Sequence, residues 1–256
     1  MSDEPRDPVE LPPETASVLA EIRAGIGPDT RVAVLSGAGI SAASGIPTFR
    51  GAQDGLWSRY RPEDLATPAA FRRDPELVWR WYDWRRGLIA GARPNAAHHA
   101  LAQLAARCPV TIITQNVDGF HQQAGSQDVL EFHGSIWRVR CTGCGREVED
   151  RRVPVPIPPR CAVCNDLQRP AVVWFGEAID PGVMRDAANA AGGCDLFVVV
   201  GTAGAVHPAA GLVQTARNAG AQILEFNTAY SAITPLVDLF VPGSAADTVP
   251  LLLTPV

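Results

Sequence analysis

The stretch VAVLSGAGISA at residues 32–42 decides the fold of this chain. Its first four residues, Val32 to Leu35, are apolar and predict a short strand buried in a parallel sheet. The next six, Gly37-Ala38-Gly39-Ile40-Ser41-Ala42, fit the pattern G-x-G-x-x-A. In that pattern the glycines let the backbone approach a pyrophosphate, and exposed N–H groups bind its oxygens. For the hexapeptide alone, a plain tight turn is the alternative.

Beyond this stretch, short apolar runs alternate with segments of helical periodicity. We expect strands at 110–113, 196–200, 223–226 and 236–241, and helices at 18–26, 96–107, 181–191 and 209–219. The alternation predicts an α/β fold built on a Rossmann-like, doubly wound parallel sheet.

The glycine turn does not continue into the long helix of a dehydrogenase. Ser44-Gly45-Ile46-Pro47 ends any helix within about two turns. A dinucleotide is therefore expected to bind without hydride transfer. Thr48-Phe49-Arg50-Gly51 is expected to form a loop over the ligand.

Two segments interrupt the alternation of strands and helices. Residues 48–95 are rich in tryptophan, and residues 135–172 contain four cysteines and a run of prolines that excludes regular structure around residues 154–159. We interpret them as one small inserted module, with helices and a metal site. The larger part then comprises about residues 14–47, 96–134 and 173–256, in a single domain that follows a flexible tail at 1–13.

Composition excludes several classes of function. The chain has 256 residues and a net charge of −5, which argues against nucleic acid as a partner. No apolar run approaches the roughly 20 residues of a membrane span, and the acidic, proline-rich start does not resemble a signal peptide. We expect a cytoplasmic protein without membrane contact. The sequence does not fix its oligomeric state, and a monomer is compatible with it.

The four clustered cysteines predict a metal site. Cys141 and Cys144 form one C-x-x-C pair, and Cys161 and Cys164 form a second after sixteen intervening residues. Two such knuckles complete a tetrahedral Zn²⁺ site that leaves no open position, so the zinc should be structural. Free or disulfide-bonded cysteines are the alternative. Cys108 and Cys194 adjoin predicted strands and are expected to be buried.

Polar residues follow the strand expected at 110–113. Thr114-Gln115-Asn116-Val117-Asp118-Gly119-Phe120-His121 should face the cleft, because ligands bind beyond the carboxyl ends of parallel strands. An Asx turn that closes the strand fits this segment equally well. His133 lies at another transition from strand to loop, where a general base could act near neutral pH. His98 and His99 lie in a helical stretch and should pack or cap.

Several separated motifs, in this order, resemble one family. They are GAGISAASGIPTFRG from Gly37, TQNVDGFH from Thr114, FHGS from Phe132, the two C-x-x-C pairs, Gly201-Thr202 and Asn227-Thr228. Together they closely resemble the sirtuins, which are NAD-dependent protein-lysine deacylases, over about residues 14–256. The resemblance implies NAD as co-substrate, one structural Zn²⁺ and acylated lysine on proteins or peptides as the substrate.

The resemblance also implies roles for individual residues. His133 would be the general base, with Asn116 and Asp118 beside it in the catalytic site. The implied NAD-binding residues are Gly37, Ala38, Gly39, Ile40, Ser41, Thr48, Phe49, Arg50, Trp57, Gln115, Asn116, Val117, Asp118, Gly201, Thr202, Ala203, Asn227, Thr228, Ala229 and Ala245. The implied lining of the acyl-lysine channel is Trp174, Phe175, Gly176 and Glu177.

In the reaction that such a site performs, the acyl oxygen attacks the nicotinamide ribose and nicotinamide leaves. His133 then takes a proton from a ribose hydroxyl. The products would be nicotinamide, free lysine and O-acyl-ADP-ribose. Alternatives are mono-ADP-ribosyl transfer to protein and a non-catalytic NAD or ADP-ribose-binding module.

Tyr82 and Arg85 indicate which acyl groups such an enzyme would remove. At i and i+3 of a predicted helix they share one face, and Y-x-x-R resembles the pair that marks sirtuins removing succinyl, malonyl and glutaryl groups. A guanidinium in an apolar pocket requires a carboxylate partner. A surface helix with Arg85 paired elsewhere is the alternative. In a departure from the family pattern, Ala203 stands where many members have serine, which removes one hydroxyl from the NAD site.

Overall fold

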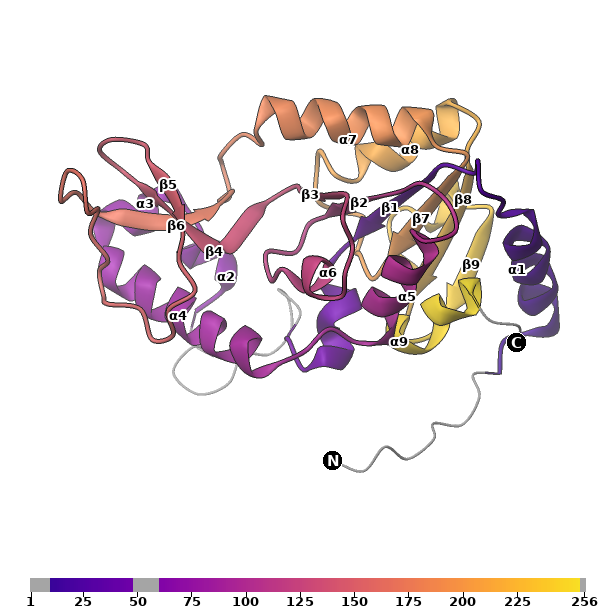
Figure 1. The fold of residues 1–256 in the computed structure, drawn as a ribbon, viewed down its shortest axis with the longest axis horizontal. Helices are drawn as coiled ribbons and strands as arrows, with labels where there is room; N and C mark the ends of the chain where they lie inside the picture. Colours follow the sequence, from indigo (N-terminus) through magenta and orange to yellow (C-terminus); the bar gives the residue numbers. More distant parts are fainter. Residues whose placement is uncertain (1–9, 48–59, 254–256) are drawn as a thin grey trace.

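A six-stranded parallel sheet forms the larger part of the molecule, in the order β3-β2-β1-β7-β8-β9 (Figure 1). The computed structural model describes residues 10–47 and 60–253. The strands of this sheet are β1 (Val32–Ser36), β2 (Val110–Thr114), β3 (Val129–Glu131), β7 (Leu196–Val200), β8 (Gln222–Asn227) and β9 (Leu239–Pro242). The doubly wound parallel sheet predicted from the sequence is confirmed.

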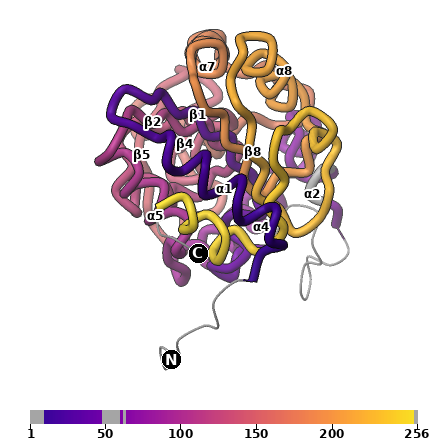
Figure 2. Tube along the Cα trace, turned by 90° about the vertical axis from the view of Figure 1, so that its right-hand side faces the viewer, coloured from indigo at the N-terminus to yellow at the C-terminus, as the bar shows by residue number. Residues whose placement is uncertain are grey.

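Two layers of helices cover the sheet, because successive side chains of each strand point to opposite faces. Val32 and Val34 belong to one core cluster, and Ala33 and Leu35 belong to the other. The helices are α1 (Pro13–Gly25), α5 (Ala96–Leu104) and α9 (Ala245–Thr248) on the first face, and α7 (Pro181–Gly193) and α8 (Gly211–Asn218) on the second. Figure 2 shows these layers on opposite sides of the sheet.

A small module extends from one end of the sheet (Figure 1, left). It contains an antiparallel sheet of order β5-β4-β6. Its elements are α2 (Pro62–Leu65), α3 (Pro68–Arg73), α4 (Pro75–Gly91), β4 (Gly134–Cys141), β5 (Glu147–Glu149) and β6 (Gln168–Val172). Large aromatic side chains from α4 and β4 fill its core, including Trp79, Trp81 and Trp137.

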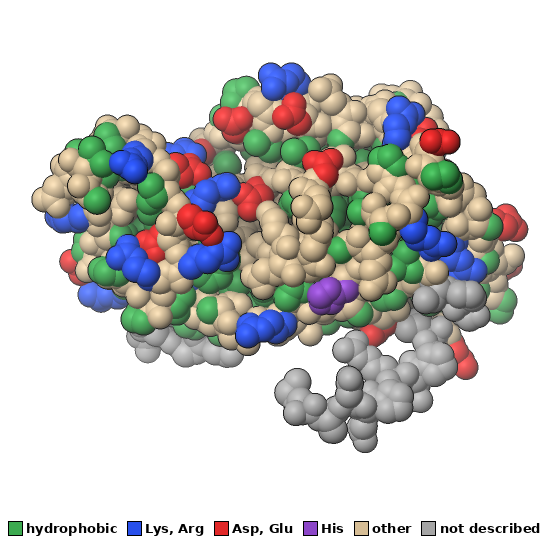
Figure 3. Space-filling view, in the orientation of Figure 1, with side chains coloured by type: hydrophobic (Ala, Val, Ile, Leu, Met, Phe, Trp, Pro, Cys, Tyr) green, Lys and Arg blue, Asp and Glu red, His purple; other side chains and the backbone are tan. Residues whose placement is uncertain are grey.

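The small module is also basic. Residues 60–95 and 134–172 contain 14 of the 22 arginines against nine acidic side chains, although the whole chain has a net charge of −5. Figure 3 shows several of these basic side chains over the small module. The acidic excess therefore lies in the rest of the chain.

Some predicted elements differ from the structure. The strand expected at 236–241 begins only at Leu239, because Thr234–Leu236 forms a 3-10 helix with a proline in its first turn. The helix expected from Ala209 begins at Gly211. The strand expected just before His133 is the three-residue β3, which ends at Glu131. Leu11, placed in the tail, packs against the core.

A helix that spans a bilayer needs about 20 predominantly apolar residues. Within residues 10–47 and 60–253, no helix has both the length and the hydropathy for such a span.

Candidate active site

The chain reverses its direction of winding between β1 and β7. From β1 it runs outward through β2 and β3, and then returns to β7 on the other side of β1. Ligands of doubly wound sheets bind at this switch point, beyond the carboxyl ends of the two strands. Here those ends lead into Gly37 and Gly201, and the residues around them form what we call the switch-point site.

Two glycine turns touch at the switch point. The N–H of Gly39 donates to the carbonyl oxygen of Gly201 over 2.8 Å. A Cβ atom on Gly39 would lie 2.7 Å from the Cα atom of Gly201, and one on Gly37 would lie 2.8 Å from the Gly201 oxygen. Gly201 itself has a φ of +58°, which favours glycine. The glycines of the first motif are therefore required by contact with the second.

Beyond Gly37, the chain forms only a short helix, which ends where the sequence predicted that any helix would end. A 3-10 helix spans Ala38–Ser44 and ends at Gly45, whose φ is +81°. Its Ile40 side chain is buried in the core of the sheet, while Ser41 points toward the segment after β2. This short helix replaces the long first helix of a dehydrogenase.

A hydrogen-bonded chain joins three predicted site residues. The amide of Asn116 donates to Ser41 Oγ over 3.2 Å and to the carbonyl oxygen of Gly37 over 3.1 Å. Ser41 Oγ in turn donates to a carboxylate oxygen of Asp118 over 2.8 Å. Burial raises the pKa of Asp118, although hydrogen bonds from the Phe120 N–H and the Ser41 hydroxyl and the charge of Arg85 oppose the shift. The structure thus brings Ser41, Asn116 and Asp118 together.

Gln115 links the same segment to the second glycine turn. Its amide donates to the hydroxyl of Thr202 over 3.1 Å, and the amide of Asn227 donates to the Thr202 carbonyl over 2.9 Å. Residues from the ends of β2, β7 and β8 therefore meet at one edge of the sheet. The neighbouring Val117 binds the small module instead, since its carbonyl accepts from the N–H of Ile136 in β4.

His133 lies half-buried where the larger sheet passes into the small module. Its Nδ1 atom lies 3.0 Å from the carbonyl oxygen of Gln115. Because a carbonyl only accepts, Nδ1 carries the proton and Nε2 keeps a free lone pair. Burial lowers the pKa of His133, against the opposing effect of this hydrogen bond. The neutral ring can therefore act as a base near pH 7.

Gly134 fixes the backbone next to this base. Its φ is +76°, and a Cβ atom there would lie 2.2 Å from the carbonyl oxygen of Ala171. The carbonyl of His133 also accepts from the N–H of Val173 over 2.9 Å. The strand pair β4–β6 therefore holds His133 in place.

Tyr82, Arg85 and Trp174 form a second cluster, which we call the Tyr82 pocket. Trp174 Nε1 donates to Tyr82 Oη over 2.9 Å, and both side chains are buried. The Arg85 guanidinium lies 5.2 Å from the Trp81 ring centroid. Desolvation lowers the pKa of Arg85, while the charges of Tyr82 and Asp118 raise it. The electrostatic effect of Asp118 on Arg85 relates the Tyr82 pocket to the switch-point site.

The other residues predicted to line the channel differ in exposure. Phe175 is 45% exposed, whereas the Trp174 ring is packed in the core of the small module. Gly176 has a φ of +85°. Glu177 pairs with Arg169 and also accepts from the backbone N–H of Trp174 over 2.9 Å. A lining role for the four stays a prediction.

The remaining predicted cofactor residues have mixed placements. Ala203, Thr228 and Ala229 are exposed after β7 and β8, and Ala245 begins α9 with 5% exposure. The predicted residues Thr48, Phe49, Arg50 and Trp57 lie outside the described residues.

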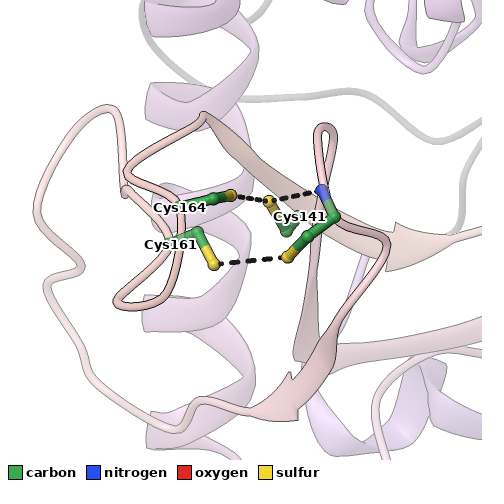
Figure 4. Close-up of side chains that lie close together, drawn as sticks. Cys141, Cys161 and Cys164 are labelled. Carbon is green, nitrogen blue, oxygen red and sulfur yellow. Dashed lines mark hydrogen bonds between the residues drawn. The ribbon is translucent and has the colours of Figure 1, made fainter.

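The four cysteines of the small module form one cluster (Figure 4). Their sulfur atoms lie within 4.8 Å of one another, and Cys141 and Cys164 are 3.3 Å apart. Ligands at about 2.3 Å in a tetrahedron are separated by about 3.8 Å. Hydrogen bonds from the N–H groups of Cys164 and Val163 lower the pKa of Cys161 to about 6, which favours the thiolate. The donor set fits one Zn²⁺ ion held at a structural site.

The surroundings of Gly143 and the positions of Cys108 and Cys194 are compatible with a zinc site made of the four clustered cysteines alone. A Cβ atom on Gly143 would lie 1.8 Å from a carboxylate oxygen of Asp166, so a larger residue at this position would displace the Asp166 side chain. Cys108 and Cys194 are buried, as predicted.

The sequence missed several side chains that support the site. Trp137 Nε1 donates to the carbonyl of Asp118 over 2.7 Å. Arg86 is fully buried, donates to the carbonyl of Ile136 over 2.9 Å and lies 3.6 Å from Asp150. Helical periodicity shows that part of α4 is buried, but it does not indicate these partners.

Comparisons with known proteins agree with the geometry. The model of the Sir2 family matches residues 37–208. The NAD-dependent protein deacylase 2 of Pyrobaculum aerophilum is 52% identical over 220 residues, or 86% of this chain and 88% of that protein. The NAD-dependent protein deacylase of Ralstonia nicotianae is 46% identical over 239 residues, which cover 93% and 97% of the two chains.

Solved structures show the same fold. A Sir2 homologue in complex with NAD superposes with a TM-score of 0.84 at 41% identity, over 96% of this chain and 94% of that one. A Sir2 variant with a deacetylated p53 peptide and 3'-O-acetyl-ADP-ribose gives 0.78 at 28% identity, over 93% and 96%. The sequence resemblance is therefore confirmed: this chain belongs to the Sir2 family.

Proposed function

We propose that this protein is an NAD-dependent protein-lysine deacylase. The observation that carries the proposal is the position of His133, whose free Nε2 lies at the junction of the switch-point site and the small module. Two glycine turns of the kind that bind dinucleotides and a histidine of lowered pKa are thus found in the same region of the protein. The names of the relatives from Pyrobaculum and Ralstonia support this activity.

The residues of the switch-point site would bind the phosphates, orient the ribose and accept a proton. Backbone N–H groups next to the glycines of the two turns would bind the phosphates of NAD, since those of Gly37, Gly39 and Gly201 already donate within the protein. Asn116 and Asp118, already connected through Ser41, would orient the nicotinamide ribose. His133 Nε2 would accept a proton from a ribose hydroxyl, because Nδ1 is held as a donor by Gln115.

The zinc-binding cluster would contribute structure rather than chemistry. Four thiolates fill the coordination sphere of Zn²⁺ and leave no position for substrate. The ion would cross-link the two turns that flank the small antiparallel sheet.

The activity is tested by mass spectrometry of the purified protein with NAD and an acyl-lysine peptide. The proposal predicts nicotinamide, free lysine and O-acyl-ADP-ribose in equal amounts, and their loss in His133→Ala. The chain contains arginine but no lysine, so every acyl-lysine signal belongs to the peptide. ADP-ribose attached to protein would instead indicate mono-ADP-ribosyl transfer. NAD binding without nicotinamide release would indicate a binding module.

We further propose that the preferred acyl groups are acidic: succinyl, malonyl or glutaryl. Arg85 lies beside Tyr82 next to the apolar core of the small module, where a guanidinium is stabilised by a carboxylate ligand. The small module has more arginines than acidic side chains, and this positive charge would also attract such substrates. The four cysteines, which would be thiolates when zinc is bound, are not included in this comparison. Peptides that differ only in the acyl group test this preference, with Arg85→Met as the variant that should lower it.

A further inference from the structure

One hydrogen bond within the Tyr82 pocket joins α4 to the segment after β6. Trp174 Nε1 donates to Tyr82 Oη over 2.9 Å, although the two residues are 92 positions apart. Trp174 is 2% exposed and Tyr82 is 4% exposed. A buried hydrogen bond of this length fixes the relative positions of both side chains.

The chemistry of the two groups determines the direction of the bond. An indole N–H only donates, so the hydroxyl oxygen of Tyr82 must accept. The proton of Tyr82 is then directed to some other acceptor. Within residues 10–47 and 60–253, no protein group accepts it. Burial raises the pKa of Tyr82 to about 12, so the hydroxyl keeps its proton at neutral pH.

Trp174 is itself held from two sides. The guanidinium of Arg169 lies 3.4 Å from the Trp174 ring centroid, and the Phe71 ring centroid lies 5.3 Å away. Arg169 donates to both carboxylate oxygens of Glu177, which also accepts from the Trp174 backbone. Arg169 and Glu177 thus fix the indole, and the indole fixes Tyr82.

Arg85 lies one helical turn beyond Tyr82 on α4, and Tyr82 affects the pKa of Arg85 electrostatically. A carboxylate beside Arg85 would therefore meet both a cation and the unused phenolic proton. An acetyl group has no carboxylate for either of them.

We propose that Trp174 is a positioning residue for acyl selection, whose indole N–H makes Tyr82 Oη an acceptor and so directs the phenolic proton to the carboxylate of an acidic acyl group beside Arg85. The inference rests on the acyl preference proposed above. It assigns Trp174 an action through Tyr82 rather than through direct contact with substrate.

The test is the ratio of kcat/KM for succinyl-lysine over acetyl-lysine peptides in Trp174→Phe. This change removes the N–H and keeps an aromatic ring. We expect the ratio to fall about tenfold, as for loss of a hydrogen bond to a charged group, through a higher KM for the succinyl peptide. Trp79→Phe is the matched control, because Trp79 Nε1 donates to the carbonyl of Gln168 in the same core. The ratio should not change there.

A double-mutant cycle tests the dependence on Tyr82. Tyr82→Phe should lower the ratio, and Trp174→Phe added to it should lower it no further. Replacement of Trp174 by benzothienylalanine, which keeps the bicyclic shape without the N–H, should reproduce Trp174→Phe even if the latter folds poorly.

Two results would overturn the inference alone. One is an unchanged ratio in both Trp174 variants while Arg85→Met and Tyr82→Phe lower it. The other is an additive loss in the double mutant. If the wild-type protein does not favour the succinyl peptide and Arg85→Met changes nothing, the proposed acyl preference fails and the inference fails with it.

Discussion

The switch-point site and the Tyr82 pocket are built in different ways. At the switch point, two backbones touch, and glycine is required because any side chain would collide with the opposite turn. In the Tyr82 pocket, buried side chains from α4 and from the segment after β6 hold one another. Backbone contact leaves a readable sequence motif, whereas side-chain contact between distant segments does not.

The two regions would also have separate tasks. The switch-point site has the dinucleotide geometry shared by many folds of this class, so it would bind the common co-substrate. The Tyr82 pocket would read the acyl group. Four changes test whether these tasks can be separated, beginning with the largest expected effect.

Loss of zinc should break the small module and leave the parallel sheet folded. Structural Zn²⁺ supplies about 10–16 kcal/mol of folding free energy in isolated zinc fingers. We therefore expect Cys161→Ser to reduce metal content well below one ion per chain and to abolish deacylation. Metal analysis and circular dichroism measure this, with Cys194→Ala as the control that keeps its zinc. An active Cys161→Ser protein without metal would contradict the structural role.

Removal of the base should affect turnover more than NAD binding. For His133→Ala we expect kcat to fall by about 10²–10⁴-fold, while calorimetry still detects NAD. The lowered pKa of His133 also predicts the shape of the pH profile. The active form is the neutral ring, so activity should be lost as pH falls through a pKa below the usual 6.5 of histidine. An acid limb above pH 6.5 would contradict this.

Crowding of the two glycine turns should affect the switch-point site alone. Gly39→Ala would place a Cβ atom 2.7 Å from the backbone of Gly201. We expect a loss of about 1–3 kcal/mol in the free energy of unfolding and weaker NAD binding. Gly87→Ala in α4 is the matched control, since its added Cβ would have no neighbour within 4 Å among the described residues outside the backbone of its own helix. It should be neutral or should stabilise the helix by up to about 1 kcal/mol; an equal loss in both variants would contradict the contact argument.

At neutral pH the smallest effect comes from the histidines behind the switch-point site, because it grows only as the pH falls below about 6.5. Burial lowers the pKa of His98 to about 2 and that of His121 to about 4. Below pH 6.5 the unfolded chain binds protons that the native state excludes. Stability is thus complete above pH 6.5 and falls by about 1.4 kcal/mol per pH unit and histidine as pH decreases.

His98→Gln removes one of the two titrating groups and should therefore reduce this acid sensitivity. Glutamine can still close the capping box with Asn95, so the start of the helix should be kept. The exposed His99 provides the control variant His99→Gln, which should keep the wild-type slope. Urea unfolding between pH 4 and pH 7 measures the difference. Equal slopes in both variants would show that burial of His98 does not cause the sensitivity.

Much of this structure was predictable from local sequence. Val32 to Leu35 form the expected strand, which Ser36 extends by one residue, because the four residues are apolar and both faces of the strand are covered. The cysteine spacing predicted the cluster at Cys141 and Cys161. A strand was expected just before His133, but the three-residue extent of β3 was not predictable, because so short a strand has no periodic signal. Nor was the bond from Trp174 to Tyr82, since no local pattern records a contact across 92 positions.

The division of tasks is tested most directly by competition between equimolar succinyl- and acetyl-lysine peptides of the same sequence, with NAD in excess. The ratio of O-succinyl- to O-acetyl-ADP-ribose then gives the ratio of the two kcat/KM values. We predict a ratio at least tenfold in favour of succinyl for the wild-type protein, and a large decrease in Arg85→Met. An equal product ratio in the two proteins would contradict the assignment of acyl choice to the Tyr82 pocket.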